Sequence, residues 1–204
     1  MLLQGMGIGL VIAAPVGVIG ILCIQRTLTQ GRWIGFVSGM GAATADGVYG
    51  CVAGLGLSAI SDLLVAQSRW LMLVGGLFLL YLGVTTFRQR PPQGEKAPEL
   101  SSEGMLKSFF SVFLLTLTNP LTIFSFLGIF SGLGLGQTSG GGSAILLVLG
   151  VFLGSALWWL ILSLGVSYLS RWFQPKNLAW LNRASGVAIT AFGIAALWRF
   201  WSVG

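Results

Sequence analysis

Residues 33–57 read WIGFVSGMGAATADGVYGCVAGLGL, an apolar run that is interrupted by a single carboxylate, Asp46. A helix rises about 1.5 Å per residue, so this run can cross a hydrocarbon layer of roughly 30 Å. In lipid the backbone must satisfy its own hydrogen bonds, which favours a helix, and the alternating polarity of a barrel strand is missing. The run therefore predicts a membrane-spanning helix with an acid near its middle.

The composition of the whole chain agrees with a membrane protein. Of its 204 residues 55% are hydrophobic and 8% are charged, whereas a soluble domain carries roughly 25% charged residues. The 31 glycines suit close helix packing in a bilayer. Basic residues are sparse and follow the ends of apolar runs, so the net charge of +6 does not indicate a nucleic-acid partner. There is no histidine, and we expect neither a metal site nor a cofactor.

Six apolar runs are long enough to span a membrane, and they predict an all-α, polytopic protein with six transmembrane helices. Basic residues gather in the first, third and fifth connections, which the positive-inside rule assigns to the cytoplasm, leaving both termini outside. The six runs are Leu3–Ile24, Trp33–Leu57, Trp70–Phe87, Phe109–Leu133, Ala144–Ser170 and Ala184–Trp201. The basic residues of those three connections are Arg26, Arg32, Arg88, Arg90, Lys96, Lys107, Arg171, Lys176 and Arg183.

The chain divides into two similar halves. Residues 1–87 form a first three-helix repeat, 88–108 a charged, Pro-rich cytoplasmic loop, and 109–204 a second three-helix repeat. Pro15 and Pro120 occupy matching places in the two halves. Because each repeat has an odd number of spans, the second must be inverted in the membrane. Inverted repeats with interrupted helices are typical of secondary transporters.

Glycines mark the third helix of each half and the helix crossings. Gly76 and Gly83 are seven residues apart, as are Gly186 and Gly193. The spacings Gly35-x-x-x-Gly39 and Gly150-x-x-x-Gly154 permit tight crossings, either within one chain or between two chains of a homodimer. The sequence leaves these two arrangements open.

Two expected helix breaks are candidates for the binding site. Pro15 removes a backbone donor and frees a carbonyl about one turn earlier, and Gly17 makes local unwinding easy. Asn119 and Pro120 form a second break that adds a side-chain amide. Freed backbone groups at such breaks could bind the ammonium and carboxylate groups of an amino acid. A purely structural kink explains each break equally well.

Asp46 and Trp158 complete the candidate site. By helical rise Pro15 and Asn119 lie roughly 15 Å, and Asp46 roughly 20 Å, from the cytoplasmic ends of their spans, which is near the midplane. A buried acid there predicts a proton carrier or a counter-charge for a cationic group, or a structural carboxylate bonded to a neighbouring helix. Trp158 offers a cation–π surface or plain core packing.

The stretch APVGVIGILCIQRTLTQGRWIGFVSGMGAATADGVYG, residues 14–50, resembles the N-terminal signature of the lysine exporter (LysE/RhtB) family of bacterial amino-acid efflux carriers. LTNPLTIFSFLGIF, residues 117–130, resembles the Asn-Pro motif of the same family. Val18 stands near the place of a second proline in the family's first motif. The positions that match the first signature are Pro15, Gly31, Arg32, Gly35, Gly41 and Asp46.

The resemblance implies a secondary transporter in the inner membrane, not an enzyme. It would export amino acids or related small metabolites, driven by the proton gradient or the membrane potential. A divalent-cation efflux carrier is an alternative, although one acid supplies few of the oxygen ligands such ions need. A thiol–disulfide carrier is a further alternative, but Cys23 and Cys51 are expected on the order of 25 Å apart, too far for a disulfide.

Overall fold

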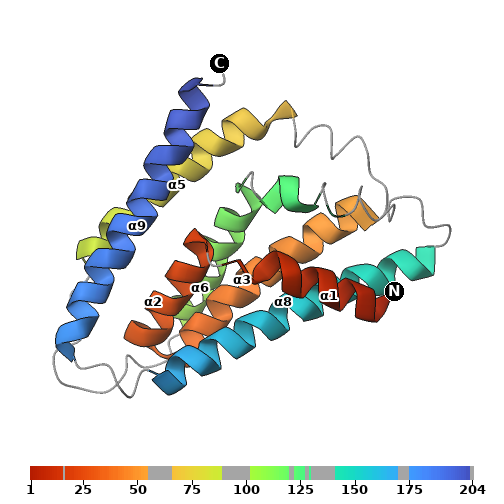
Figure 1. Cartoon of the computed structure of the whole chain (residues 1–204), viewed down its shortest axis with the longest axis horizontal. Helices are drawn as coiled ribbons and strands as arrows, with labels where there is room; N and C mark the ends of the chain where they lie inside the picture. Colours follow the sequence, from red (N-terminus) through yellow and green to blue (C-terminus); the bar gives the residue numbers. More distant parts are fainter. Residues whose placement is uncertain are drawn as a thin grey trace.

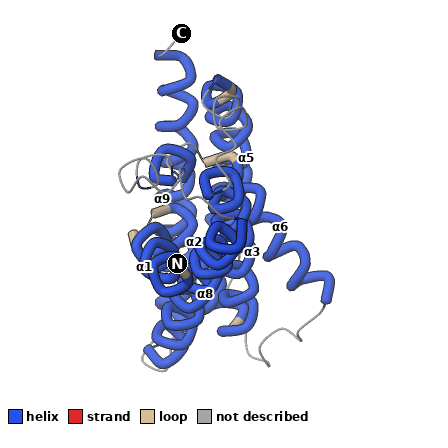
Figure 2. The backbone as a smooth tube through the Cα atoms, turned by 90° about the vertical axis from the view of Figure 1, so that its right-hand side faces the viewer, coloured by secondary structure: helices blue, strands red, loops and turns tan. Residues whose placement is uncertain are grey.

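The structure is a computed structural model that describes residues 1–15, 17–54, 66–88, 102–119, 122–126, 129, 141–169 and 175–202. Within these ranges the chain is helical, with short turns between helices and no strand, as Figure 2 shows. The helices are α1 (Leu2–Ala13), α2 (Val18–Gln30), α3 (Arg32–Gly54), α5 (Ser68–Arg88), α6 (Ser102–Leu117), α8 (Gly141–Leu169) and α9 (Pro175–Ser202).

Several of these helices suit a membrane. Within the described part of the chain, α5, α8 and α9 are each long and apolar enough to cross a bilayer, and α1 with α2 is apolar enough as a bent pair, either a broken span or a re-entrant loop. α3 has 23 residues, enough to cross by length, but its glycines, hydroxyl groups and Asp46 make it more polar. The described helices therefore support a membrane protein, and the number of six spans stays a prediction.

The run predicted as the first span is bent at its proline. α1 ends at Ala13 and α2 begins at Val18, with an angle of 83° between them and Pro15 in the break. The prediction of one run over Leu3–Ile24 was wrong in its extent, because α2 continues to Gln30. Hydrophobicity alone ended the span too early, since the second half of α2 is polar.

The fourth predicted span is also interrupted. α6 ends at Leu117, and the carbonyl of Asn119 then accepts a hydrogen bond from the Thr122 backbone N–H at 3.1 Å as the chain turns helical again over 122–126. Asn119 therefore lies in a helix break, as expected, and Pro120 lies outside the described residues. The predicted start at Phe109 was too late, because α6 begins at Ser102.

This early start shortens the loop predicted over 88–108. Arg88 belongs to α5 and residues 102–108 belong to α6, while 89–101 lie outside the described residues. Glu103 and Lys107 form an ion pair of 2.6 Å at i,i+4 spacing, which supports the first turn of α6, and the acid is favourable near a helix N-terminus. The exposed pairing lowers the pKa of Glu103 and raises that of Lys107.

α3 lies at the centre of the helix packing (Figure 1). It contacts α8 and α6, while α1 packs along α8, and α2 touches α3, α8 and α9. α5 and α9 pack together and extend past the other helices at the C-terminal end (Figures 1 and 2).

Glycines permit two of these contacts. A Cβ atom on Gly150 of α8 would lie 2.9 Å from the Cα of Gly5 in α1, and one on Gly154 would collide with the carbonyl of Met6. On α3, a Cβ on Gly39 would collide with the ring of Trp159 in α8. Both glycine spacings found in the sequence thus serve crossings within one chain.

α5 and α9, the predicted third helices of the two halves, cross where their glycines meet. A Cβ atom on Gly193 would lie 3.0 Å from the carbonyl oxygen of Gly76, and one on Gly83 would lie 3.0 Å from that of Gly186. The residue numbers rise on one helix as they fall on the other, so the two helices run antiparallel.

Candidate functional site

Asp46 lies at the junction of three helices. Its side chain on α3 is 3% exposed, and Ser155 on α8 donates its hydroxyl to Oδ2 at 2.7 Å. The backbone nitrogen of Ser155 adjoins Gly9 of α1. Among the described residues Ser155 is the one hydrogen-bond partner of Asp46. This bond agrees with the interpretation of Asp46 as a structural carboxylate bonded to a neighbouring helix. The second carboxylate oxygen, Oδ1, has no hydrogen-bond partner among the described residues.

Tyr49 connects the region of Asp46 to the second helix break. It lies one turn further along α3, and its hydroxyl donates to the Leu117 carbonyl at 2.6 Å. Leu117 is the last residue of α6, where carbonyls lose their helical partners, so the tyrosine satisfies an acceptor that the break exposes. α3 therefore carries both the buried acid and a cap for the end of α6.

The other predicted site residues lie as follows. Pro15 is exposed in the break between α1 and α2, and Gly17 is half-buried before the first residue of α2. Asn119 follows the end of α6. Trp158 is half-buried and packs against the apolar cluster that includes Ala42 and Trp159. The described contacts do not join these residues directly to Asp46, so their grouping into one site stays a prediction.

Two buried polar groups of α8 follow its contact with Asp46 along the helix. Gly39 faces Trp159 and Asp46 faces Ser155, so the helices are antiparallel. Trp159 Nε1 and Ser163 Oγ are buried, and neither has a hydrogen-bond partner among the described residues. A buried group left in this way costs about 1–3 kcal/mol. Two unsatisfied groups one turn apart on α8 are therefore unusual.

Arg26 is the clearest residue that the sequence analysis missed. It was assigned to a cytoplasmic connection, but it lies in α2 and its side chain is 9% exposed. Nη1 donates to Ser38 Oγ and to the Ser108 carbonyl, both at 2.9 Å, and Nη2 donates to Ser111 Oγ at 2.8 Å. The signal was present as a polar run, QRTLTQ over 25–30, that contains no helix breaker before Gly31.

Gln25, the residue before Arg26, ties α2 to another helix. Its amide nitrogen donates to Asn182 Oδ1 of α9 at 2.9 Å, and both side chains are fully buried. Together these two residues attach the polar half of α2 to α3, α6 and α9. The cysteines are not part of this network: Cys23 is fully buried in α2, Cys51 is half-buried in α3, and both are free thiols.

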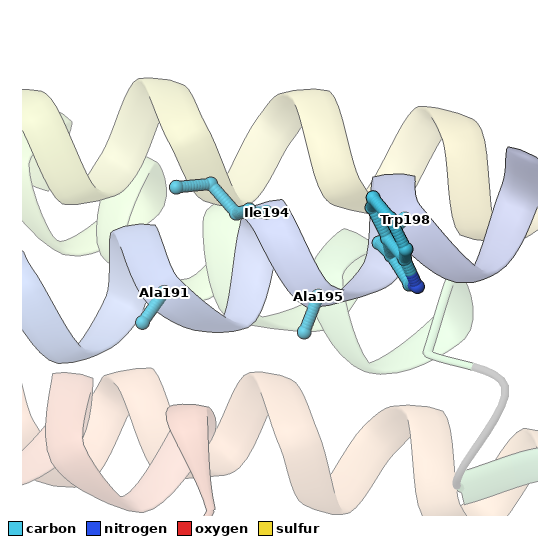
Figure 3. Close-up of a pocket in the computed structure, with 4 residues that line it drawn as sticks. All are labelled: Ala191, Ile194, Ala195 and Trp198. Carbon is cyan, nitrogen blue, oxygen red and sulfur yellow. The ribbon is translucent and has the colours of Figure 1, made fainter.

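A shallow groove of about 450 Å³ lies on α9, away from these residues (Figure 3). Its lining is apolar, and Ile194 and Trp198 are 58% and 74% exposed. None of the candidate site residues lines it, and an apolar surface on an outer helix suits contact with lipid. The lining residues are Ala191, Ile194, Ala195 and Trp198. In the part of the chain that the structure describes, no cluster of three metal-ligating side chains occurs.

Comparison with known proteins assigns the family. The model of the LysE type translocator family matches residues 10–199. The chain is 30% identical over 190 residues to the "Putative amino acid efflux protein YcgF" of Bacillus subtilis, covering 91% of this chain and 90% of the relative. It is 28% identical to the "Uncharacterized membrane protein YahN" of Escherichia coli, over 69% of this chain and 63% of the relative. No solved structure matches. The chain therefore belongs to the LysE type translocator family.

Proposed function

We propose that this translocator is a secondary exporter of amino acids or related small metabolites in the inner (plasma) membrane. The family match over residues 10–199 and the relative named for amino acid efflux support the substrate class. The observation that carries the proposal is Asp46, an acid that is 3% exposed on a central helix. Burying a carboxylate in a membrane costs several kcal/mol or more, so such residues usually mark an ion or substrate pathway.

Asp46 is proposed to bind the ammonium group of the substrate. Ser155 occupies Oδ2, which orients the carboxylate, and Oδ1 can accept a donor from the substrate. The helix breaks at Pro15 and at Asn119 with Pro120 would supply backbone carbonyls as acceptors. Gly17 would let the substrate approach the backbone closely, and the Trp158 ring would make a cation–π contact with the ammonium group. The end of α6, where Leu117 and Asn119 lie, is linked to α3 through the Tyr49 hydroxyl. Because α3 belongs to the first half and α6 to the second, this link supports a site between the two halves.

The helix pairing supports the proposal of two inverted repeats. A repeat that relates α1 to α6 and α3 to α8 turns the helix pair α1–α8 into the pair α6–α3. Both of these pairs are in contact. Gly76 meets Gly193 and Gly83 meets Gly186, which is the reciprocal pattern expected at a two-fold axis. A two-fold axis in the membrane plane would relate two halves of opposite orientation.

Transport would alternate between two protonation states of Asp46. The ionised carboxylate holds the substrate ammonium, and a proton entering from outside displaces it and returns the carrier to its starting state. The proton gradient would then drive export. Divalent-metal efflux is the weaker candidate, because hard cations need several oxygen ligands and Asp46 has no second carboxylate beside it among the described residues.

Efflux from intact cells tests this function. Cells that produce the protein would be loaded with labelled leucine, lysine or glutamate, which represent neutral, cationic and anionic amino acids, and compared with cells that carry an empty vector. We expect faster efflux of at least one of them and loss of this gain with Asp46→Asn. Efflux equal to the empty vector for a wider panel of amino acids would contradict the proposal.

A further inference from the structure

We propose that Arg26 binds the carboxylate of the exported substrate, and that Ser38, Ser108 and Ser111 occupy its guanidinium while the pathway is closed. The inference rests on the proposed function, since it identifies a second part of the substrate site. It also narrows the substrate class to solutes with a free carboxylate.

The first argument is an uncompensated charge. Arg26 is 9% exposed, and its three acceptors are two hydroxyl groups and one backbone carbonyl, all of them neutral. Among the described residues no carboxylate pairs with it; the ion pair that is present joins Glu103 and Lys107 at the exposed start of α6. A buried cation without an anion is costly, so a residue that is kept there needs a partner that arrives from elsewhere.

The second argument concerns what a charge contributes. Both serine hydroxyls already donate, Ser38 to the Ile34 carbonyl and Ser111 to the Ser108 carbonyl. The three acceptors around Arg26 therefore need three N–H donors, and a glutamine amide offers two. A guanidinium adds a fixed positive charge and a planar pair of donors that matches a carboxylate. Holding α2 to its neighbours accounts for the number of donors but makes no use of the charge, whereas binding an anion uses both.

The third argument is that α2 can exchange its partners. It lies between two breaks in the helical chain, the 83° bend at Pro15 and the connection at Gly31, whose φ is +98°. Side chains other than glycine rarely adopt that conformation. A short helix with a joint at each end can move without unfolding, and such a movement would release Arg26 from Ser38, Ser108 and Ser111.

Arg26 and Asp46 lie at different levels of the α3–α8 seam. Ser38 precedes Asp46 by eight residues on α3, which places the two levels about 12 Å apart along the helix. On the facing helix, the unsatisfied Trp159 Nε1 and Ser163 Oγ follow Ser155 by four and eight residues. Trp159 lies opposite Gly39, so the α3–α8 seam leads from the acid to an unsatisfied group at the level of Ser38, which the Arg26 guanidinium contacts. The ammonium and carboxylate of an α-amino acid are separated by a single carbon atom, so such a solute would contact Asp46 and Arg26 in turn along this seam and not both at once.

The test compares acids with their amides in proteoliposomes that contain the purified protein. The probes are leucine and lysine with leucinamide and lysinamide, in which a neutral amide replaces the carboxylate. We expect the wild type to prefer the acids, and Arg26→Gln to lower acid transport about tenfold or more, as for one lost charge-assisted contact. Amide transport should not change, so the preference for acids disappears.

Two further variants separate binding from folding. Arg32→Gln removes an exposed cation at the start of α3 that lies 5.5 Å from the Trp33 ring, and it should keep the preference for acids. Ser111→Ala removes one neutral partner of Arg26 and should lower the KM for the acids, because the guanidinium is released more easily.

Equal losses of acid and amide transport in Arg26→Gln would overturn the inference. If that variant does not fold, an unchanged KM for the acids in Ser111→Ala would overturn it instead. A wild type that transports none of the acids argues against the proposed function, and the inference then fails with it. Transport of acids by the wild type with no preference over amides removes the inference alone.

Discussion

At the scale of single residues, the chain keeps two opposite charges away from water and does not pair them. Asp46 accepts a hydrogen bond from one serine hydroxyl, and Arg26 donates hydrogen bonds to three neutral acceptors. The sequence revealed Asp46, because an acid inside an apolar run is conspicuous. It did not reveal Ser155 or the burial of Arg26, since both depend on which helices meet in space.

The hydrogen bond to Asp46 can be tested with two serines of the same helix. Ser155→Ala removes the partner of a buried carboxylate and should lower the free energy of unfolding by about 1–3 kcal/mol. Ser163→Ala removes a buried hydroxyl that has no partner among the described residues, so it should keep the free energy of unfolding or raise it by up to about 1–3 kcal/mol. Thermal unfolding of the purified variants in one detergent compares them. Equal effects of the two substitutions would contradict the assigned contact.

At the scale of helices, glycine and proline decide where the elements approach and where they break. The sequence predicted the breaks at Pro15 and Asn119 because proline cannot continue a helical hydrogen-bond pattern. It did not predict that α2 leaves at 83° and continues through a polar second half. Hydropathy measures contact with lipid, whereas this half of α2 is buried among other helices of the protein.

The close contact between α1 and α8 can be tested with two glycines of α8. Gly154→Ala would push a methyl group into the carbonyl of Met6 and should destabilise the protein by about 1–3 kcal/mol. Gly165→Ala has no atom within 4 Å of the added methyl group and should be neutral or slightly stabilising, since alanine favours helices. Unfolding of both variants in detergent gives the comparison. A stable Gly154→Ala variant would argue against this crossing.

At the scale of the whole molecule, the family and the membrane class could be predicted from the sequence, and the comparisons confirmed them. The pairing of helices could not, because it depends on contacts between residues far apart in the chain. Gly76 and Gly193 are an example: each is seven residues from a second glycine, Gly83 or Gly186, which suggested a repeat, and the structure shows that Gly76 and Gly193 meet. The orientation in the membrane stays a prediction that follows from the distribution of basic residues.

The orientation is open to a direct test. A protease-cleavable tag would be fused to the C-terminus, and a second one would be inserted between residues 89 and 101, within the predicted cytoplasmic loop. With both termini outside, protease added to intact spheroplasts should remove the first tag and spare the second, and inverted vesicles should show the reverse. Cleavage of the loop tag in intact spheroplasts would contradict the predicted topology.

The most direct test of the central claim is the response of export to a pH gradient in proteoliposomes that contain wild type or Asp46→Asn. The asparagine keeps the size of the side chain and its capacity to accept the Ser155 hydroxyl, but it cannot carry a proton. For the wild type, acid on the side toward which the amino acid is exported should accelerate export, because protonation of Asp46 releases the substrate there. For Asp46→Asn we expect slow export that is independent of the gradient. Export by Asp46→Asn with the pH dependence of the wild type would contradict the account.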